Sequence, residues 1–187
     1  MSVNETGSSL LSLLIIMFVV AIAVAVFIIV GGTIWVIVKA RKNGFSNSKK
    51  VIFYTIGAII IAAFSWVLNF GWLRFIMTFY LIPIIHAIIF FLANMFLAKY
   101  TDQSSKMQKL NSLFIIAYLA TYVFLPDGGD IGEMYFFFGL IHNDIISYIA
   151  SFVSRIAGVG HIVLFILQLV EINKIKKTIS ENNVLHP

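Results

Sequence analysis

The sequence predicts an all-α protein, a polytopic bundle of transmembrane helices with five spans. Of its 187 residues, 60% are hydrophobic and only 11% are charged, whereas soluble domains carry about 25% charged residues. Apolar runs long enough to cross the hydrocarbon layer, which takes about 20 helical residues, follow one another along the chain. The connections between them are too short for a soluble domain, so we expect one integral membrane domain over residues 1–187.

The first predicted span covers residues 10–38. It is longer than the bilayer requires, so it must tilt, project or bend, and Gly31-Gly32 is a place for a bend. Ala21 and Ala25 form a small-xxx-small pair, which allows a second helix to approach closely. We therefore expect Ala21 and Ala25 to contact another helix, including one from a partner membrane protein.

Four further apolar runs complete the predicted bundle. Pro83 should kink the third span because it removes a backbone donor, and Pro126 should end the fourth. The connection 126–144 contains an apolar segment, 134–141, that is too short to cross and is expected to lie at the interface. The predicted second to fifth spans are residues 51–70, 75–98, 110–125 and 145–170.

Basic residues predict the orientation of these spans. Eleven of the thirteen Lys and Arg residues lie in the segments 39–50, 99–109 and 174–177, which follow the first, third and fifth spans. The positive-inside rule makes this face cytoplasmic. Five spans then place the N-terminus outside and the C-terminus in the cytoplasm, in a multi-pass protein of the plasma membrane. The net charge of +5 is explained by this distribution, so no nucleic-acid partner is expected.

The fifth span has an unusual polar stripe, with Arg155 beside it. Small and polar residues at three- and four-residue spacing share one helical face, which should pack against other helices. An arginine near the centre of a span costs about 2.5–3.5 kcal/mol and is a functional candidate by default. The stripe consists of Ser147, Ser151, Ser154, Gly158, His161, Phe165 and Gln168.

Arg155 and His86 are expected at similar depths, so they are candidates for one ligand site that opens outward between the second, third and fifth spans. Arg155 would pair with an anionic group, and His86 would be a proton-sensitive neighbour. A structural role for Arg155, in which it ties helices together, is the alternative. The predicted ligand-binding residues are Arg155, His86, Ser151, Tyr80, Asn69 and His161.

Two further sites are conceivable from residue type. His86 and His161 on facing helices suggest a haem, although His161 should lie about 7 Å deeper at 1.5 Å per residue. Asp127, Asp130 and Glu133 on the outer loop suggest a site for a hard cation, which binds oxygen ligands. A solvated acidic loop and helix-to-helix hydrogen bonds are the competing interpretations, and no cofactor is required by the sequence.

The sequence favours a non-enzymatic function. It has no cysteine, which excludes disulfides and thiol chemistry, and it has none of the motifs typical of hydrolases or phosphate-binding loops. Our first hypothesis is small-solute binding or transport through a polar pocket between helices. The alternatives are an accessory, assembly or immunity protein that binds another membrane protein, and a haem-binding redox protein.

Overall fold

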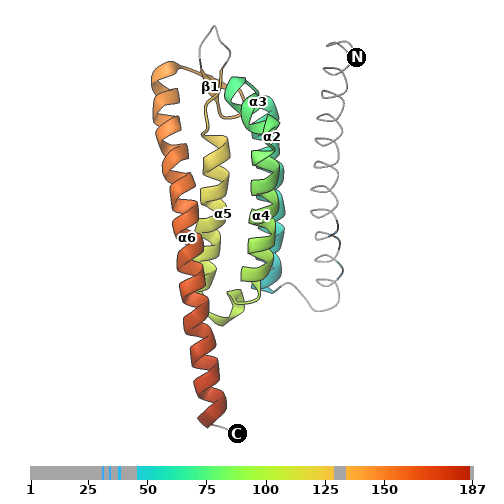
Figure 1. The fold of residues 1–187 in the computed structure, drawn as a ribbon, viewed down its shortest axis with the longest axis vertical. Helices are drawn as coiled ribbons and strands as arrows, with labels where there is room; N and C mark the ends of the chain where they lie inside the picture. The colour runs from blue at the N-terminus through green and yellow to red at the C-terminus, as the bar shows by residue number, and fades with distance from the viewer. Residues whose placement is uncertain (1–30, 32–33, 35–37, 39–45, 129–133, 186–187) are drawn as a thin grey trace, which may run out of the picture.

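A computed structural model describes residues 46–128 and 134–185, together with Gly31, Ile34 and Val38. The described chain is mostly helical, as the sequence predicted. The predicted first span, with Ala21 and Ala25, lies otherwise outside the described residues. Four long helices run side by side (Figure 1): α2 (Asn47–Leu68), α4 (Ile82–Ala98), α5 (Ser105–Val123) and α6 (Asp144–Leu185).

The helices alternate in direction between two ends of the bundle. A short helix, α3 (Trp72–Phe79), joins α2 to α4 at one end, beside the hairpin of β1 (Tyr135–Phe136) and β2 (Ile141–His142). We name this the hairpin end. At the opposite, C-terminal end, the 3₁₀ helix η1 (Thr101–Gln103) leads from α4 into α5, and α6 projects beyond the other helices (Figure 1).

Among the described residues, three helices are long and apolar enough to cross a membrane. They cover Asn47–Leu68, Ile82–Gln103 and Asp144–Glu181. The shorter α5 begins five residues before the predicted Leu110 and therefore includes Lys106 and Lys109, which lowers its apolar character. It nevertheless packs lengthwise against both α2 and α6, so it belongs to the same bundle.

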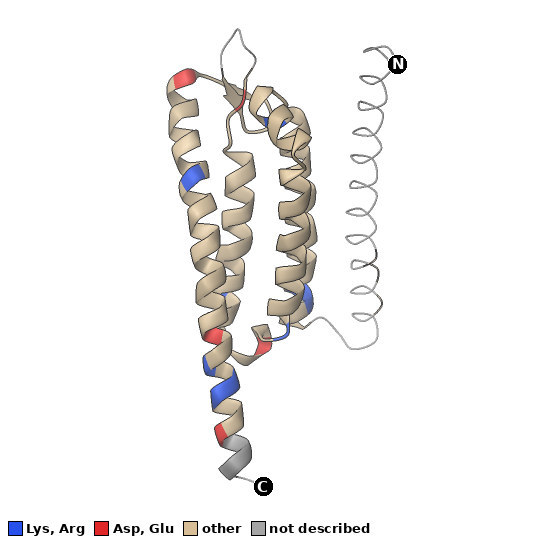
Figure 2. Ribbon diagram, in the orientation of Figure 1, with Lys and Arg blue, Asp and Glu red and all other residues tan. Residues whose placement is uncertain are grey.

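Charged residues are concentrated at the ends of the bundle (Figure 2). Described lysines lie at the start of α2, between α4 and α5, in the first turns of α5 and on the far part of α6, so all of them are at the C-terminal end. The hairpin end contains Arg74, Asp127 and Asp144. This arrangement is typical of a helical bundle whose middle lies in hydrocarbon.

The helix starts at the C-terminal end are fixed by side chains. The carboxylate of Asp102 in η1 accepts hydrogen bonds from the backbone of Asn47 and Ser48 and from the Ser48 hydroxyl, at 2.7–3.4 Å. It thereby satisfies backbone donors that the first turn of α2 leaves unpaired. Ser104 caps α5 in the same way by accepting from the Met107 amide. These contacts tie α2 to the connection between α4 and α5.

The predicted third span is wrong as a single kinked helix. Residues 72–98 form two helices, α3 and α4, separated at Tyr80 and Leu81. Leu81 has a φ of 57°, a left-handed conformation that interrupts the helical ladder. Pro83 therefore lies in the first turn of α4, where its missing N–H costs nothing, rather than in a helix interior.

The predicted apolar segment of the outer connection forms a tight hairpin. Phe137, Phe138 and Gly139 all adopt positive φ values between the two strands. Phe136 is 2% exposed, and Asp127 pairs with Tyr135 to extend the hairpin toward the end of α5. The segment thus closes the hairpin end of the bundle.

Small and polar residues of α2 and α6 face the interior of the bundle, as predicted for α6. Ser65 donates a hydrogen bond to the Tyr122 carbonyl at 3.1 Å, and Ser154 donates to the Thr121 carbonyl at 2.7 Å. The predicted polar stripe of α6 is buried or half-buried along its length. It packs mainly on α5, so the packing interpretation of the stripe is confirmed.

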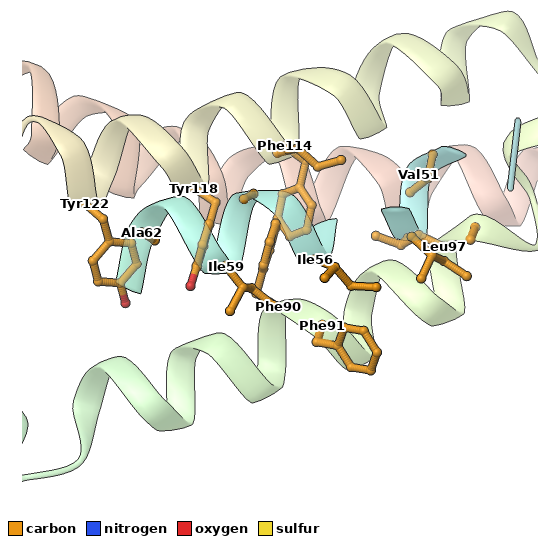
Figure 3. Packing of buried hydrophobic residues seen from close by; sticks show 14 of the residues in the cluster. Val51, Ile56, Ile59, Ala62, Phe90, Phe91, Leu97, Phe114, Tyr118 and Tyr122 are labelled. Carbon is orange, nitrogen blue, oxygen red and sulfur yellow. The ribbon is translucent and has the colours of Figure 1, made fainter. Parts of the chain in front are cut away.

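The apolar core lies between α2, α4 and α5 (Figure 3). Phe90 of α4 stacks on Tyr118 of α5 with ring centroids 3.8 Å apart. Tyr118 and Tyr122 project from α5 toward α4 in Figure 3, with their hydroxyl groups on the α4 side. These two tyrosines form the boundary between the core and the site described next.

Candidate functional site

His86 and His161 lie together in the structure. Their imidazole rings are in edge-to-face contact, with centroids 5.3 Å apart. His161 stacks on Phe114 at 4.0 Å, and its Nδ1 lies 3.3 Å from the Phe114 carbonyl. The predicted difference in depth between the two histidines does not keep them apart. Because the rings touch directly, a haem between them would require the rings to separate, and haem binding stays a prediction.

His86 also contacts the tyrosines of α5. Its Nδ1 lies 2.7 Å from the Tyr122 hydroxyl, a short hydrogen bond between side chains, and its ring lies 5.2 Å from that of Tyr118. A ring of aromatic and imidazole groups thus links α4, α5 and α6 across the middle of the bundle. This cluster has few polar atoms, and apolar side chains surround them.

The structure does not place the other predicted ligand residues in this cluster. Asn69 is buried at the hairpin end, where its amide donates to the Ser65 hydroxyl at 3.3 Å. Tyr80 is 65% exposed beside the break between α3 and α4. Ser151 is half-buried on α6, and Arg155 lies on the exposed side of that helix. These contacts therefore do not form a single polar pocket that contains all six predicted residues.

The predicted cation site is described only at Asp127, because Asp130 and Glu133 lie outside the described residues. Asp127 is 4% exposed, and its two carboxylate oxygens accept hydrogen bonds from backbone amides at the start of α3 and in its own loop. The donors are the amides of Gly71, Leu73, Arg74 and Gly128, at 2.8–3.1 Å. Asp127 therefore acts as a cap for α3. Within the described ranges, no group of three His, Asp or Glu side chains could hold a metal ion.

Arg74 is the arginine that ties helices together, the structural role that the sequence also allows for Arg155. Its side chain is completely buried. The guanidinium donates to the carbonyls of Ser65, Tyr122 and Leu125, at 3.2 Å and 2.7 Å for the last two. It also lies 5.1 Å from the centre of the Trp66 ring. Arg74 thus joins the ends of α2 and α5 to α3.

The charge of Arg74 is only partly compensated. Its Nε is 4.0 Å from an oxygen of Asp127 and has no hydrogen-bond partner among the described residues. Burial lowers the pKa of Arg74 to about 10, while the nearby Asp127 carboxylate opposes this shift. The sequence signal for this residue is its isolation, since Arg74 is one of the two basic residues that lie outside the three basic segments.

An apolar cavity of about 590 Å³ lies next to the two tyrosines, in the hairpin-end half of the bundle. Residues of α2 and α4 form its walls. Tyr118 and Tyr122 of α5 and Thr78 of α3 complete the lining. Ala63 and Val67 at its rim are exposed on the outer surface of α2, so the cavity opens sideways, between helices. Its other lining residues include Ile59, Ala62, Trp66, Phe70, Pro83, Ile84 and Ala87.

Hydroxyl groups provide the polar part of this cavity. The Thr78 oxygen accepts a hydrogen bond from the Trp66 indole at 2.9 Å, which leaves its own proton available to donate. The Tyr118 hydroxyl has no hydrogen-bond partner in the described part of the chain. Tyr122 is bound to His86 but retains capacity for a second hydrogen bond. A mostly apolar cavity with a few placed polar groups is the usual form of a small-molecule site.

Fold and site together define a class, a helical bundle with three described helices that could span a membrane and an apolar cavity between its helices. Comparisons of the chain with models of protein families, with curated proteins and with solved structures find no significant match.

Proposed function

We propose that this is a non-catalytic integral membrane protein that binds, and in binding transports or presents, a lipid-soluble small molecule. The observation that supports this proposal is the 590 Å³ cavity between α2 and α4. This volume falls within the range of about 300–1,000 Å³ that is typical of sites for small molecules. The sideways opening allows entry from the bilayer, where a lipid-soluble molecule is concentrated.

The chemistry of the lining narrows the solute class. Apolar walls favour an apolar body, and the hydroxyls of Thr78 and Tyr118 favour a polar group that accepts hydrogen bonds. The proposed solute is thus amphipathic, with a carbonyl, hydroxyl or ether oxygen near one end. A strongly anionic solute is disfavoured, because Arg155 is not in the lining and the charge of Arg74 is directed to backbone carbonyls.

Five spans, with the N-terminus outside and the C-terminus in the cytoplasm of a cell membrane, remain part of the proposal. The clustering of described lysines at one end of the bundle supports it through the positive-inside rule. Because the chain contains no cysteine, single cysteines can test it in intact cells. Asn143→Cys should react with an impermeant maleimide before lysis, and Ser180→Cys only after lysis. The reverse pattern would overturn the orientation.

Native mass spectrometry of the protein, extracted gently from its own membrane, tests solute binding. We expect an adduct of a few hundred daltons on the 21.0 kDa chain. Ala63→Phe should remove the adduct by filling the mouth of the cavity without entering the core. Ala157→Phe is the matched control, because it places the same ring in a separate groove between α5 and α6. A bare wild-type chain, or an adduct that survives Ala63→Phe, would contradict the proposal.

A second candidate function is that of an accessory, assembly or immunity protein that binds another membrane protein. It is favoured by a different observation, the exposed charge of Arg155 on α6. The predicted contact at Ala21 and Ala25 would belong to the same function. A chain that carries a second polypeptide, and no small adduct, in the mass spectrum would favour this candidate.

A further inference from the structure

The α6 face around Arg155 combines a charge with an apolar surface. Tyr148, Phe152, Val159 and Ile162 are all more than 60% exposed and surround Arg155 at one- and two-turn spacing. Arg155 is exposed as well, and it makes no hydrogen bond or ion pair with a described residue. Lipid alone can solvate an apolar surface of this kind, but the positive charge of Arg155 needs a counter-charge.

The position of Arg155 along α6 places it within the hydrocarbon layer. Asp144 and Glu171 are 27 residues apart, about 40 Å of helix, which matches a bilayer with its headgroups. Arg155 is eleven residues from Asp144, about 16 Å along the helix axis. Its backbone is therefore about 10 Å below the outer edge of the hydrocarbon, more than an arginine side chain spans.

The described part of the chain has no carboxylate at this depth. Its eight acidic residues lie in the N-terminal segment, in the connections, at the first residue of α6, or on α6 from Glu171 onward. The apolar segment 10–38 contains no acidic residue. A second copy, parallel or antiparallel, would bring its described carboxylates only to the two ends of the bundle. No described carboxylate of this chain or of a second copy can therefore neutralise Arg155.

We propose that the Arg155 face of α6 docks a transmembrane helix of a different protein, and that this helix bears an Asp or Glu at the depth of Arg155. The surrounding exposed side chains would supply the apolar contact. This docking rests on the second candidate function, the binding of another membrane protein, and it is independent of the cavity, which lies between other helices, so a failure of solute binding leaves it standing.

The test uses the full-length protein in phosphatidylcholine vesicles at pH 8, with synthetic probe helices. Each probe is a leucine helix with lysines at both ends and one variable residue, about seven positions from an end. Energy transfer between labelled protein and labelled probe reports association. The probes carry Asp, Asn or Leu, and the protein variants are Arg155→Leu, Arg155→Lys and, as a charge-matched control, Lys174→Leu.

We expect the Asp probe to bind the wild-type protein at least tenfold more tightly than the Leu probe. Arg155→Leu should abolish this preference, Arg155→Lys should retain part of it, and Lys174→Leu should leave it unchanged. Equal binding of the Asp and Leu probes would overturn the proposal. Loss of the preference when phosphatidylglycerol is added would also overturn it, because Arg155 would then pair with lipid phosphate.

Discussion

Arg74 in α3 and Arg155 in α6 illustrate two ways in which this bundle accommodates an arginine. Arg74 is completely buried and surrounded by carbonyls from the ends of α2 and α5, with Asp127 nearby. Arg155 is exposed on a helix face and has no partner in the described chain. In this bundle the buried arginine therefore stabilises the fold, whereas the exposed arginine is available to bind a partner outside the chain.

The largest effect is expected when the region around Arg74 loses its carboxylate. Asp127→Ala removes the acceptor for the first amides of α3 and leaves Arg74 buried without a counter-charge. Removing one member of a buried charged pair costs about 3–5 kcal/mol. Unfolding by sodium dodecyl sulfate in mixed micelles should measure this loss.

Asp144→Ala is the control for that change, since Asp144 is exposed at the same end and accepts one hydrogen bond, from the Met134 amide. It should cost no more than about 1 kcal/mol. Equal losses of unfolding free energy for Asp127→Ala and Asp144→Ala would mean that the buried carboxylate beside Arg74 stabilises the fold no more than an exposed one.

A smaller loss is expected from Gly71→Ala. A methyl group at this position would lie 2.7 Å from both the Asp127 carboxylate and the Gly128 carbonyl, so the α3 cap must shift. Such overpacking costs about 1–3 kcal/mol. Gly160→Ala, where a methyl group meets open space in the interior of α6, should instead stabilise by about 0.5–1 kcal/mol. The same unfolding assay decides whether the two changes have opposite signs.

The smallest effect is expected on the buried side of α6. Ser154→Ala removes a hydrogen bond of 2.7 Å to the Thr121 carbonyl. Hydrogen bonds between membrane helices contribute about 0.6 kcal/mol on average. Ser180→Ala, on the exposed far part of the same helix, should change the free energy of unfolding by less than that. If Ser154→Ala lowered the free energy of unfolding by more than about 2 kcal/mol, the buried contacts of α6 would stabilise the fold as strongly as those around Arg74.

The sequence predicted helical segments and buried faces better than it predicted the site. The polar stripe of α6 was recognisable because an intramembrane polar group needs a helix as neighbour, and spacing alone shows which residues share a face. The break at Leu81 was not recognisable, because a leucine in a left-handed conformation leaves no compositional signal. Pro83 indicated an interruption nearby but not its form.

The site residues depended on helix order, which a single sequence does not contain. Contact between His86 and His161 required α4 and α6 to face each other across α5. Arg74 was overlooked because its partners are backbone carbonyls, which every residue possesses. Asp127 was recognised as an oxygen ligand, but the groups that it binds are amides of α3, 53–56 residues away along the chain.

The most direct test of this account compares the unfolding of Arg74→Leu and Arg155→Leu in the same detergent. We predict that Arg74→Leu loses about 3–5 kcal/mol, because three carbonyls and Asp127 lose their shared partner. Arg155→Leu should change the free energy of unfolding of the isolated protein by no more than about 0.5 kcal/mol, as is usual for an exposed substitution. A loss at Arg155 as large as that at Arg74 would contradict the assignment of one arginine to the fold and the other to an external partner.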